Sequence, residues 1–140
     1  MAHYAILDEN NIVVNVITGR DETDTIDGNE QNWEANYAAQ FDVPTERCKR
    51  TSYNTHQNVH TNGGTPFRGN YAGIGMKYDS TNDVFVTAEA PFPGWVIDTN
   101  IWEYKAPVDK PADFDSKPYQ WDADAYAADN TTGWVEIIPE

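Results

Sequence analysis

Short apolar runs separated by tight turns are the feature that most limits what this chain can fold into. Between Tyr71 and Tyr104, the runs Met76–Asp79 and Val84–Val86 flank one turn, and the runs Trp95–Asp98 and Ile101–Trp102 flank another. Both turns consist of Asp, Asn, Ser or Thr. An apolar run, a polar turn and a second apolar run are the sequence form of a β-hairpin.

The same pattern occurs at both ends of the chain. Its flanking runs there are Tyr4–Leu7 with Ile12–Ile17, and Tyr119–Trp121 with Trp134–Ile137. Eighteen aromatic residues stand beside a single leucine, a composition that suits sheets better than long helices. At 140 residues, we predict one mainly β domain over residues 1–140. Antiparallel hairpins would form a small sandwich or an open barrel, with one short helix at about residues 30–41.

The helix is predicted from a four-residue spacing. Trp33, Tyr37 and Phe41 recur every fourth position within Asn29–Phe41, which places them on one face. Pro44 prevents the helix from continuing beyond Val43. Two residues can cap its start, Asp27 and Asn29. We expect a short amphipathic helix that lies on a sheet.

Other segments have weaker signals. In the second strand of the first hairpin, strict alternation would place Val14 and Val16 on one face and Val13 on the other. Residues 45–70 combine one strand-like run with a long polar loop, in which Asn62-Gly63-Gly64 marks a turn. Three prolines make residues 106–118 a stiff linker before the C-terminal hairpin. That hairpin can hold one helical turn within residues 122–129.

The net charge of −14 argues against nucleic-acid binding. There are 23 acidic and nine basic residues, and phosphate backbones repel such a surface. Only Arg47, Lys49, Arg50 and the more distant Arg68 form a local basic patch. No apolar run approaches the length of a membrane helix, and the N-terminal residues lack the features of a signal peptide. We therefore expect synthesis in a cytoplasm and no membrane partner.

Three groups of residues could in principle bind a metal or react. Asp21, Asp24 and Asp27 fall every third residue, which does not match a helix-loop-helix calcium loop. His56 and His60 are four apart but lie in a non-helical context, so backbone hydrogen bonds are the favoured interpretation. The single cysteine, Cys48, is interpreted as a small apolar strand residue. No metal or cofactor is predicted.

The sequence lacks the spacing of a known catalytic apparatus. Four hairpin acids could supply a carboxylate pair, but acids in turns usually bond their own backbone. They are Asp79, Asp83, Asp98 and Glu103. Gly73-Ile74-Gly75 lacks the third glycine of a dinucleotide loop and is interpreted as close packing at a strand entry. We predict no enzyme, and no catalytic, cofactor-binding or metal residues.

The aromatic residues allow two interpretations. Tyr78 with Phe85, and Trp95 with Trp102, are expected to be cross-strand pairs that stabilise the sheet. The five tryptophans could instead form a sugar-binding surface, because aromatic rings stack on the apolar faces of sugars. A chain with few aliphatic residues needs its aromatic residues in the core, so the structural role is favoured.

Several strings in the sequence resemble a family. They are MAHYAILDENNIVVNVI, CKRTSYNTH, NYAGIGMKYD, PFPGWVID and GWVEI. They resemble a group of short, uncharacterised structural proteins of tailed phages of marine cyanobacteria. The resemblance follows the order of the chain and covers most of it. It implies a structural role in or on the virion and supplies no catalytic residues.

The resulting hypothesis is a bacteriophage accessory protein that acts by protein–protein interaction. It would decorate or cement the capsid, or be associated with the tail, neck or fibres, after synthesis in the host bacterial cytoplasm. Its partners would be capsid or tail proteins, and it would be a homo-oligomer or present in many copies. The alternative is a carbohydrate-binding module for host recognition.

Overall fold

The computed structural model describes residues 2–139 and divides the chain into two compact units. Unit 1 comprises residues 1–89 and 98–103, and unit 2 comprises residues 90–97 and 104–140. The boundary runs through the hairpin of β10 (Val96–Asp98) and β11 (Glu103–Lys105). The single domain expected over residues 1–140 stays a prediction.

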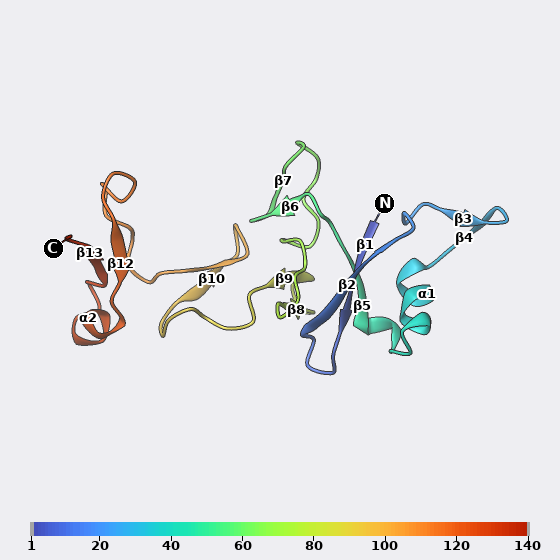
Figure 1. Cartoon of the computed structure of the whole chain (residues 1–140), viewed down its shortest axis with the longest axis horizontal. Helices are drawn as coiled ribbons and strands as arrows, with labels where there is room; N and C mark the ends of the chain where they lie inside the picture. The colour runs from blue at the N-terminus through green and yellow to red at the C-terminus, as the bar shows by residue number, and fades with distance from the viewer. Residues whose placement is uncertain (1, 140) are drawn as a thin grey trace. The chain divides into compact units, whose positions relative to one another are not determined.

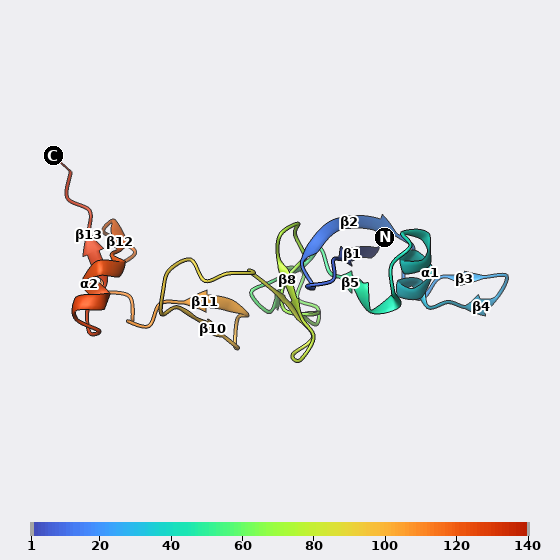
Figure 2. The same ribbon diagram turned by 90° about the horizontal axis from the view of Figure 1, so that it is seen from below.

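The fold is mainly β, as predicted, and its strand pairs are antiparallel. The described residues form two α-helices, one near the predicted short helix and one where a single helical turn was predicted. Figures 1 and 2 show these elements. Before the boundary hairpin, unit 1 contains β1 (Ala2–Leu7), β2 (Val13–Gly19), β3 (Thr25–Ile26), β4 (Asn29–Glu30), α1 (Trp33–Gln40), the 3₁₀ turn η1 (Thr45–Arg47), β5 (Cys48–Thr51), β6 (Thr55–His56), β7 (Val59–His60), β8 (Lys77–Asp79) and β9 (Val84–Val86). After that hairpin, unit 2 contains β12 (Tyr119–Trp121), α2 (Ala123–Ala128) and β13 (Trp134–Glu136).

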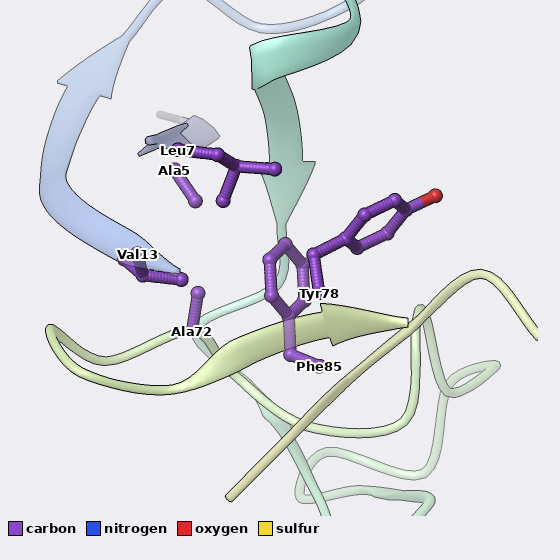
Figure 3. Close-up of a cluster of buried hydrophobic side chains, with 6 residues drawn as sticks. All are labelled: Ala5, Leu7, Val13, Ala72, Tyr78 and Phe85. Carbon is purple, nitrogen blue, oxygen red and sulfur yellow. The ribbon is translucent and has the colours of Figure 1, made fainter. Parts of the chain in front are cut away.

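A three-stranded sheet in the order β2-β1-β5 is the centre of unit 1. Its middle strand is buried on both faces, which explains the unbroken apolar run Tyr4–Leu7. On one face, Tyr4 and Ile6 pack with Trp33 of α1. On the other face, Ala5 and Leu7 lie in a second buried cluster with Phe85 (Figure 3). Unit 1 therefore has a helix on one face of the sheet and the β8–β9 hairpin on the other.

The strict alternation predicted for β2 is wrong because the strand contains a bulge. Ile6 pairs with Asn15 but Leu7 pairs with Val13, so Val14 is an extra residue. Val13 is consequently buried in the same cluster against which Val16 packs, while Val14 is exposed. A bulge inserts one residue and shifts the inward face of a strand. Apolar composition alone does not reveal such a shift.

The helix begins later than predicted, because a hairpin precedes it. β3 and β4 are joined by Asp27 and Gly28, both at positive φ, which is the geometry of a two-residue hairpin turn. Asn32 is the actual N-cap, and its Oδ1 accepts a hydrogen bond of 3.0 Å from the Ala35 N–H. Asp27 and Asn29 do not cap the helix. The helix ends at Gln40.

The β8–β9 hairpin covers the other face of the sheet. Tyr78 and Phe85 are paired across it as predicted, with ring centroids 5.3 Å apart. The Asp79 carboxylate accepts hydrogen bonds from the backbone N–H groups of Thr81 and Asn82, the turn role expected for this acid. Gly75 lies at φ +92, and the position that a Cβ would occupy there is open space. Gly75 is therefore a turn residue that needs positive φ, and the close packing predicted for it is wrong.

Unit 2 is built around aromatic rings. Trp121 contacts both Trp95 and Trp134 edge to face, at centroid distances of 5.6 and 5.2 Å. Gly133 lies so close to Trp121 that a Cβ would stand 2.3 Å from the ring. α2 occupies the position predicted for one helical turn, with Asp122 as its cap. Small aliphatic side chains contribute little to this core.

Residues 106–118 pack against the C-terminal hairpin. The Trp134 indole N–H donates to the Val108 carbonyl at 2.9 Å, and the Phe114 ring meets the Trp134 ring edge to face at 5.4 Å. The Tyr119 hydroxyl donates to Asp113 at 2.7 Å. The segment predicted as a linker is thus part of the packing of unit 2.

The predicted cross-strand pair of Trp95 and Trp102 is wrong. Neither residue lies in a strand, and Trp102 is a turn residue at φ +54. Trp95 packs with the other tryptophans of unit 2, whereas the Trp102 ring lies against Gly69 in unit 1. The hairpin itself was predicted, but its turn is longer by two residues than the sequence suggested, so Trp102 is excluded from the strand.

Candidate functional site

Two neighbouring pockets on unit 1 form the candidate site. The arginine pocket has a volume of about 400 Å³ and is lined by Tyr4, Glu22, Gln31, Asn32, Trp33, Glu34, Arg50, Phe67 and Arg68. The tyrosine pocket has a volume of about 260 Å³ and is lined by Ala2, His3, Asp21, Glu22, Thr23, Arg50, Thr51, Ser52, Tyr53 and Asn54. Glu22 and Arg50 line both pockets. The two hollows therefore meet at one pair of side chains.

Arg68 organises the arginine pocket. Its Nη1 donates to Glu34 of α1 and to the Arg50 carbonyl of β5, both at 2.9 Å. Its Nε donates to the Asp83 carboxylate at 2.8 Å, which also accepts the hydroxyl hydrogen bond of Tyr78. One guanidinium thus connects the helix, the central sheet and the β8–β9 hairpin. Desolvation lowers the pKa of Arg68, but Glu34 and Asp83 outweigh this, so that the pKa is raised and the charge is retained.

Arg50 is held in place between the pockets. Its Nε forms an ion pair with Glu22, and its guanidinium lies 3.8 Å from the centre of the Phe67 ring. A cation over an aromatic face is attracted by the ring quadrupole. The basic patch expected at Arg47, Lys49, Arg50 and Arg68 is therefore partly neutralised, because Arg50 and Arg68 are paired with acids. These ion pairs were not predicted because Glu22 and Glu34 are distant in sequence from Arg50 and Arg68.

Three rings form an aromatic cluster beside the tyrosine pocket. Tyr53 stacks on His3 with centroids 5.7 Å apart, and it meets Tyr71 edge to face at 5.4 Å. His3 and Tyr71 also meet edge to face, at 5.5 Å. The Tyr53 side chain nevertheless stays 63% exposed. The Tyr53 ring is therefore in contact with two other rings and still exposed to solvent.

The histidines bond to the loop backbone, as predicted. A His56 ring nitrogen lies 3.2 Å from the Tyr53 carbonyl, and His60 Nδ1 accepts hydrogen bonds from the N–H groups of Asn62 and Gly64. They lie in the two strands of a hairpin, β6–β7, that was not recognised in the sequence because its strands are only two residues long. Within residues 2–139, no group of three or more His, Cys, Asp or Glu side chains is arranged to hold a metal ion.

Cys48 is an apolar strand residue, as predicted. It is fully buried in β5 against α1, and burial together with the nearby Glu34 raises the pKa of its thiol to about 12. A thiol with so high a pKa is neutral at physiological pH and a poor nucleophile. Cys48 therefore contributes packing to unit 1.

The four hairpin acids have separate structural tasks. Asp79 and Asp98 accept backbone N–H groups of their own turns. Asp83 bonds Arg68 and Tyr78, and Glu103 accepts a hydrogen bond from the Gln57 side chain at 2.8 Å. The predicted turn role is confirmed for Asp79 and Asp98, whereas it is wrong for Asp83 and Glu103, which bond side chains distant in sequence. The absence of enzymatic activity stays a prediction.

The tryptophans do not provide an open stacking surface. Trp33 and Trp121 are buried, and the other three are half-buried. The exposed ring of unit 1 that lies beside a polar pocket is Tyr53. Sequence reasoning missed it, although its neighbours Ser52, Asn54 and the basic run before them were visible signals of a polar surface.

Alkaline conditions are expected to destabilise the protein through Tyr4. Burial, followed by the nearby Tyr37, raises the pKa of Tyr4 from 10.0 to about 12. The folded protein then holds this proton more tightly than the unfolded chain does. The corresponding stability is complete below the unfolded pKa of 10.0 and is lost as pH rises through the folded pKa of about 12.

The measurement is the urea midpoint of the wild type and of Tyr4→Phe between about pH 9 and about pH 11. The variant loses the hydrogen bond from the Tyr4 hydroxyl to the Arg20 carbonyl, so it starts from a lower midpoint. Its midpoint should then fall less over this range than that of the wild type. Tyr53→Phe is the matched control, since the exposed Tyr53 makes no hydroxyl hydrogen bond within the described chain. Equal slopes for the wild type and Tyr4→Phe would contradict the prediction.

Comparisons of the chain with protein-family models, with curated proteins and with solved structures find no match. Among the described residues, neither helix is long and apolar enough to span a membrane.

Proposed function

We propose that this chain is an accessory structural protein of a tailed-phage particle and that it works by binding other virion proteins. The observation that carries the proposal is the exposure of its branched aliphatic side chains. Eight of its twenty Val, Ile and Leu residues are exposed: Val14, Ile26, Val59, Ile74, Val96, Val135, Ile137 and Ile138. Five of them stand singly, as is common on protein surfaces, whereas Val135, Ile137 and Ile138 are grouped, and such a group favours a surface that a partner covers.

The C-terminal run is the densest of these surfaces. Val135 lies in β13, Ile137 and Ile138 come directly after that strand, and Ile138 is 77% exposed. β13 belongs to a two-stranded sheet, so one of its edges faces no strand within the described residues. Apolar side chains on an edge strand are suited to pairing with another chain. A second contribution comes from charge, because the acidic exterior complements basic patches on a shell or tail protein.

The sequence strings described above support the choice of a phage particle. Multiple copies around a symmetric shell or tail would allow a modest contact to suffice, since avidity multiplies weak sites. Capsid decoration, cementing, and attachment at the neck, tail or fibres all use this mode of binding. The protein would be made in the host cytoplasm and reside in the virion, without a nucleic-acid or membrane partner.

The experiment is quantitative mass spectrometry of gradient-purified particles. We expect the chain at a constant molar ratio to the major shell or tail protein in repeated preparations. Ile138→Asp should lower this ratio at least tenfold, because it places a charge in the proposed contact. Val59→Asp is the control, because Val59 is an exposed valine of unit 1 that stands alone, outside the C-terminal run, and it should leave the ratio unchanged. Absence of the wild-type chain from intact particles would refute the proposal.

A further inference from the structure

The tyrosine pocket and its aromatic cluster combine two features that suit one ligand class. Tyr53 offers an exposed ring whose orientation is held by His3 and Tyr71. Such a fixed ring loses little conformational freedom when something stacks on it. The ring stands at the rim of a hollow that is lined mostly by polar side chains. A ligand with one apolar face and several hydroxyl groups would match both features.

The polar lining supplies donors and acceptors with fixed positions. Arg50 is immobilised by its ion pair with Glu22 and by its stacking on Phe67. The hydroxyl groups of Thr23 and Ser52 make no side-chain hydrogen bond within the described residues, which leaves them available to a ligand. Guanidinium groups donate hydrogen bonds, carboxylates accept them, and hydroxyl groups do both. A ligand with many hydroxyl groups can bond to all three, whereas an anionic ligand lacks donors and an apolar ligand lacks both.

The ligand's charge and length follow from the surroundings. A net charge of −14 and the carboxylate of Glu22 at the junction disfavour acidic glycans. Since both pockets are lined by Glu22 and Arg50, a linear molecule can continue from one hollow into the next. Volumes of about 260 and 400 Å³ belong to the small end of ligand sites, which fits one or two sugar rings in each.

We propose that the tyrosine and arginine pockets of unit 1 form a binding site for a neutral hexopyranose oligosaccharide. One sugar ring stacks its apolar face on Tyr53, and its hydroxyls bond Arg50, Glu22 and the neighbouring hydroxyl side chains. The following sugar extends past the Arg50–Glu22 pair into the arginine pocket. This site is independent of the protein–protein surface proposed for the C-terminal run, and it uses tyrosine where the sequence had suggested tryptophan.

The test uses the full-length ¹⁵N-labelled chain and two probes, cellotriose and D-glucose. Both are neutral, and the β-linked glucose rings of cellotriose present flat apolar faces. We expect amide shifts on titration that are confined to residues 2–3, 21–23 and 50–54 at the tyrosine pocket, and to residues 31–34 and 67–68 at the arginine pocket. A Kd of about 1 mM is expected for cellotriose, with D-glucose at least tenfold weaker.

A matched pair of variants isolates the stacking contact. Tyr53→Phe keeps the ring and should bind within about twofold of the wild type, whereas Tyr53→Ala removes it and should bind at least tenfold more weakly. Both substitutions are at an exposed side chain, so the amide spectrum reports directly that each variant is folded. Absence of localised shifts with either probe, or unchanged binding by Tyr53→Ala, would overturn the proposal. Equal affinity for the two probes would overturn the extension into the arginine pocket.

Discussion

Replacement of Phe85 by alanine is expected to lower the free energy of unfolding of unit 1 by about 4 kcal/mol. The ring is fully buried, and it packs among Leu7, Val13 and Tyr78 between the central sheet and the β8–β9 hairpin (Figure 3). Alanine removes the buried apolar surface of the ring and leaves a cavity that the sheet and the β8–β9 hairpin can close only in part. A loss of this size is a large part of the stability of a domain of this length.

Urea unfolding followed by amide hydrogen exchange measures this effect. Exchange of the β1 and β9 amides should accelerate most, because these strands flank the cavity. Phe41→Ala is the matched control, since Phe41 is 37% exposed at the end of α1 and its removal should cost below about 1 kcal/mol. An equal loss for both variants would contradict the placement of Phe85 at the centre of unit 1.

Replacement of Arg68 by methionine is expected to lower the free energy of unfolding of unit 1 by about 3 kcal/mol. It leaves Glu34 without its ion pair, Asp83 without one of its two partners and the Arg50 carbonyl without the donor from Arg68. Removal of one partner from a buried pair typically costs 3–5 kcal/mol, and the value lies at the low end here because the Asp83 side chain is 57% exposed and regains water. Methionine keeps much of the stem and the same backbone preference at φ +52.

Equilibrium urea unfolding of Arg68→Met, Arg47→Met and the double variant Arg68→Met with Glu34→Gln tests this. Arg47 has no ion pair within residues 2–139, so Arg47→Met should change the free energy of unfolding by at most about 0.5 kcal/mol. The double variant should be more stable than the sum of its single changes predicts, because the uncompensated carboxylate is gone. Strict additivity, or a cost for Arg68→Met equal to that of Arg47→Met, would refute the role of Arg68 as the connecting residue.

Local signals were sufficient for several elements. Asp79 and the residues after it predicted the β8–β9 turn, because an Asp side chain bonds backbone N–H groups two and three residues ahead. The hairpin pairing of Tyr78 with Phe85 followed from that turn. The helical turn predicted within residues 122–129 is α2. Each of these features depends on contacts within about ten residues.

Other features depended on contacts that sequence patterns do not contain. The ion pairs of Arg68 join residues 15 and 34 positions apart, so the sequence did not show that acids partly neutralise the predicted basic patch. The bulge at Val14 placed Val13, and not Val14, on the same face of β2 as Val16. The ring of Tyr53 belongs to an aromatic cluster only because the fold places His3 of β1 and Tyr71 beside it. These arrangements follow from which strands become neighbours.

The sequence by itself determined that the chain is a set of antiparallel hairpins with a short helix, an acidic surface and a core that combines aromatic rings with Val and Ile. Turn chemistry and alternation are local, so a linear pattern carries them. Only the tertiary structure decided which rings are buried, which charges are paired and where pockets form. Tyr53 and Arg68 show the reason: burial and pairing depend on packing between distant segments, and short local patterns carry no record of that packing.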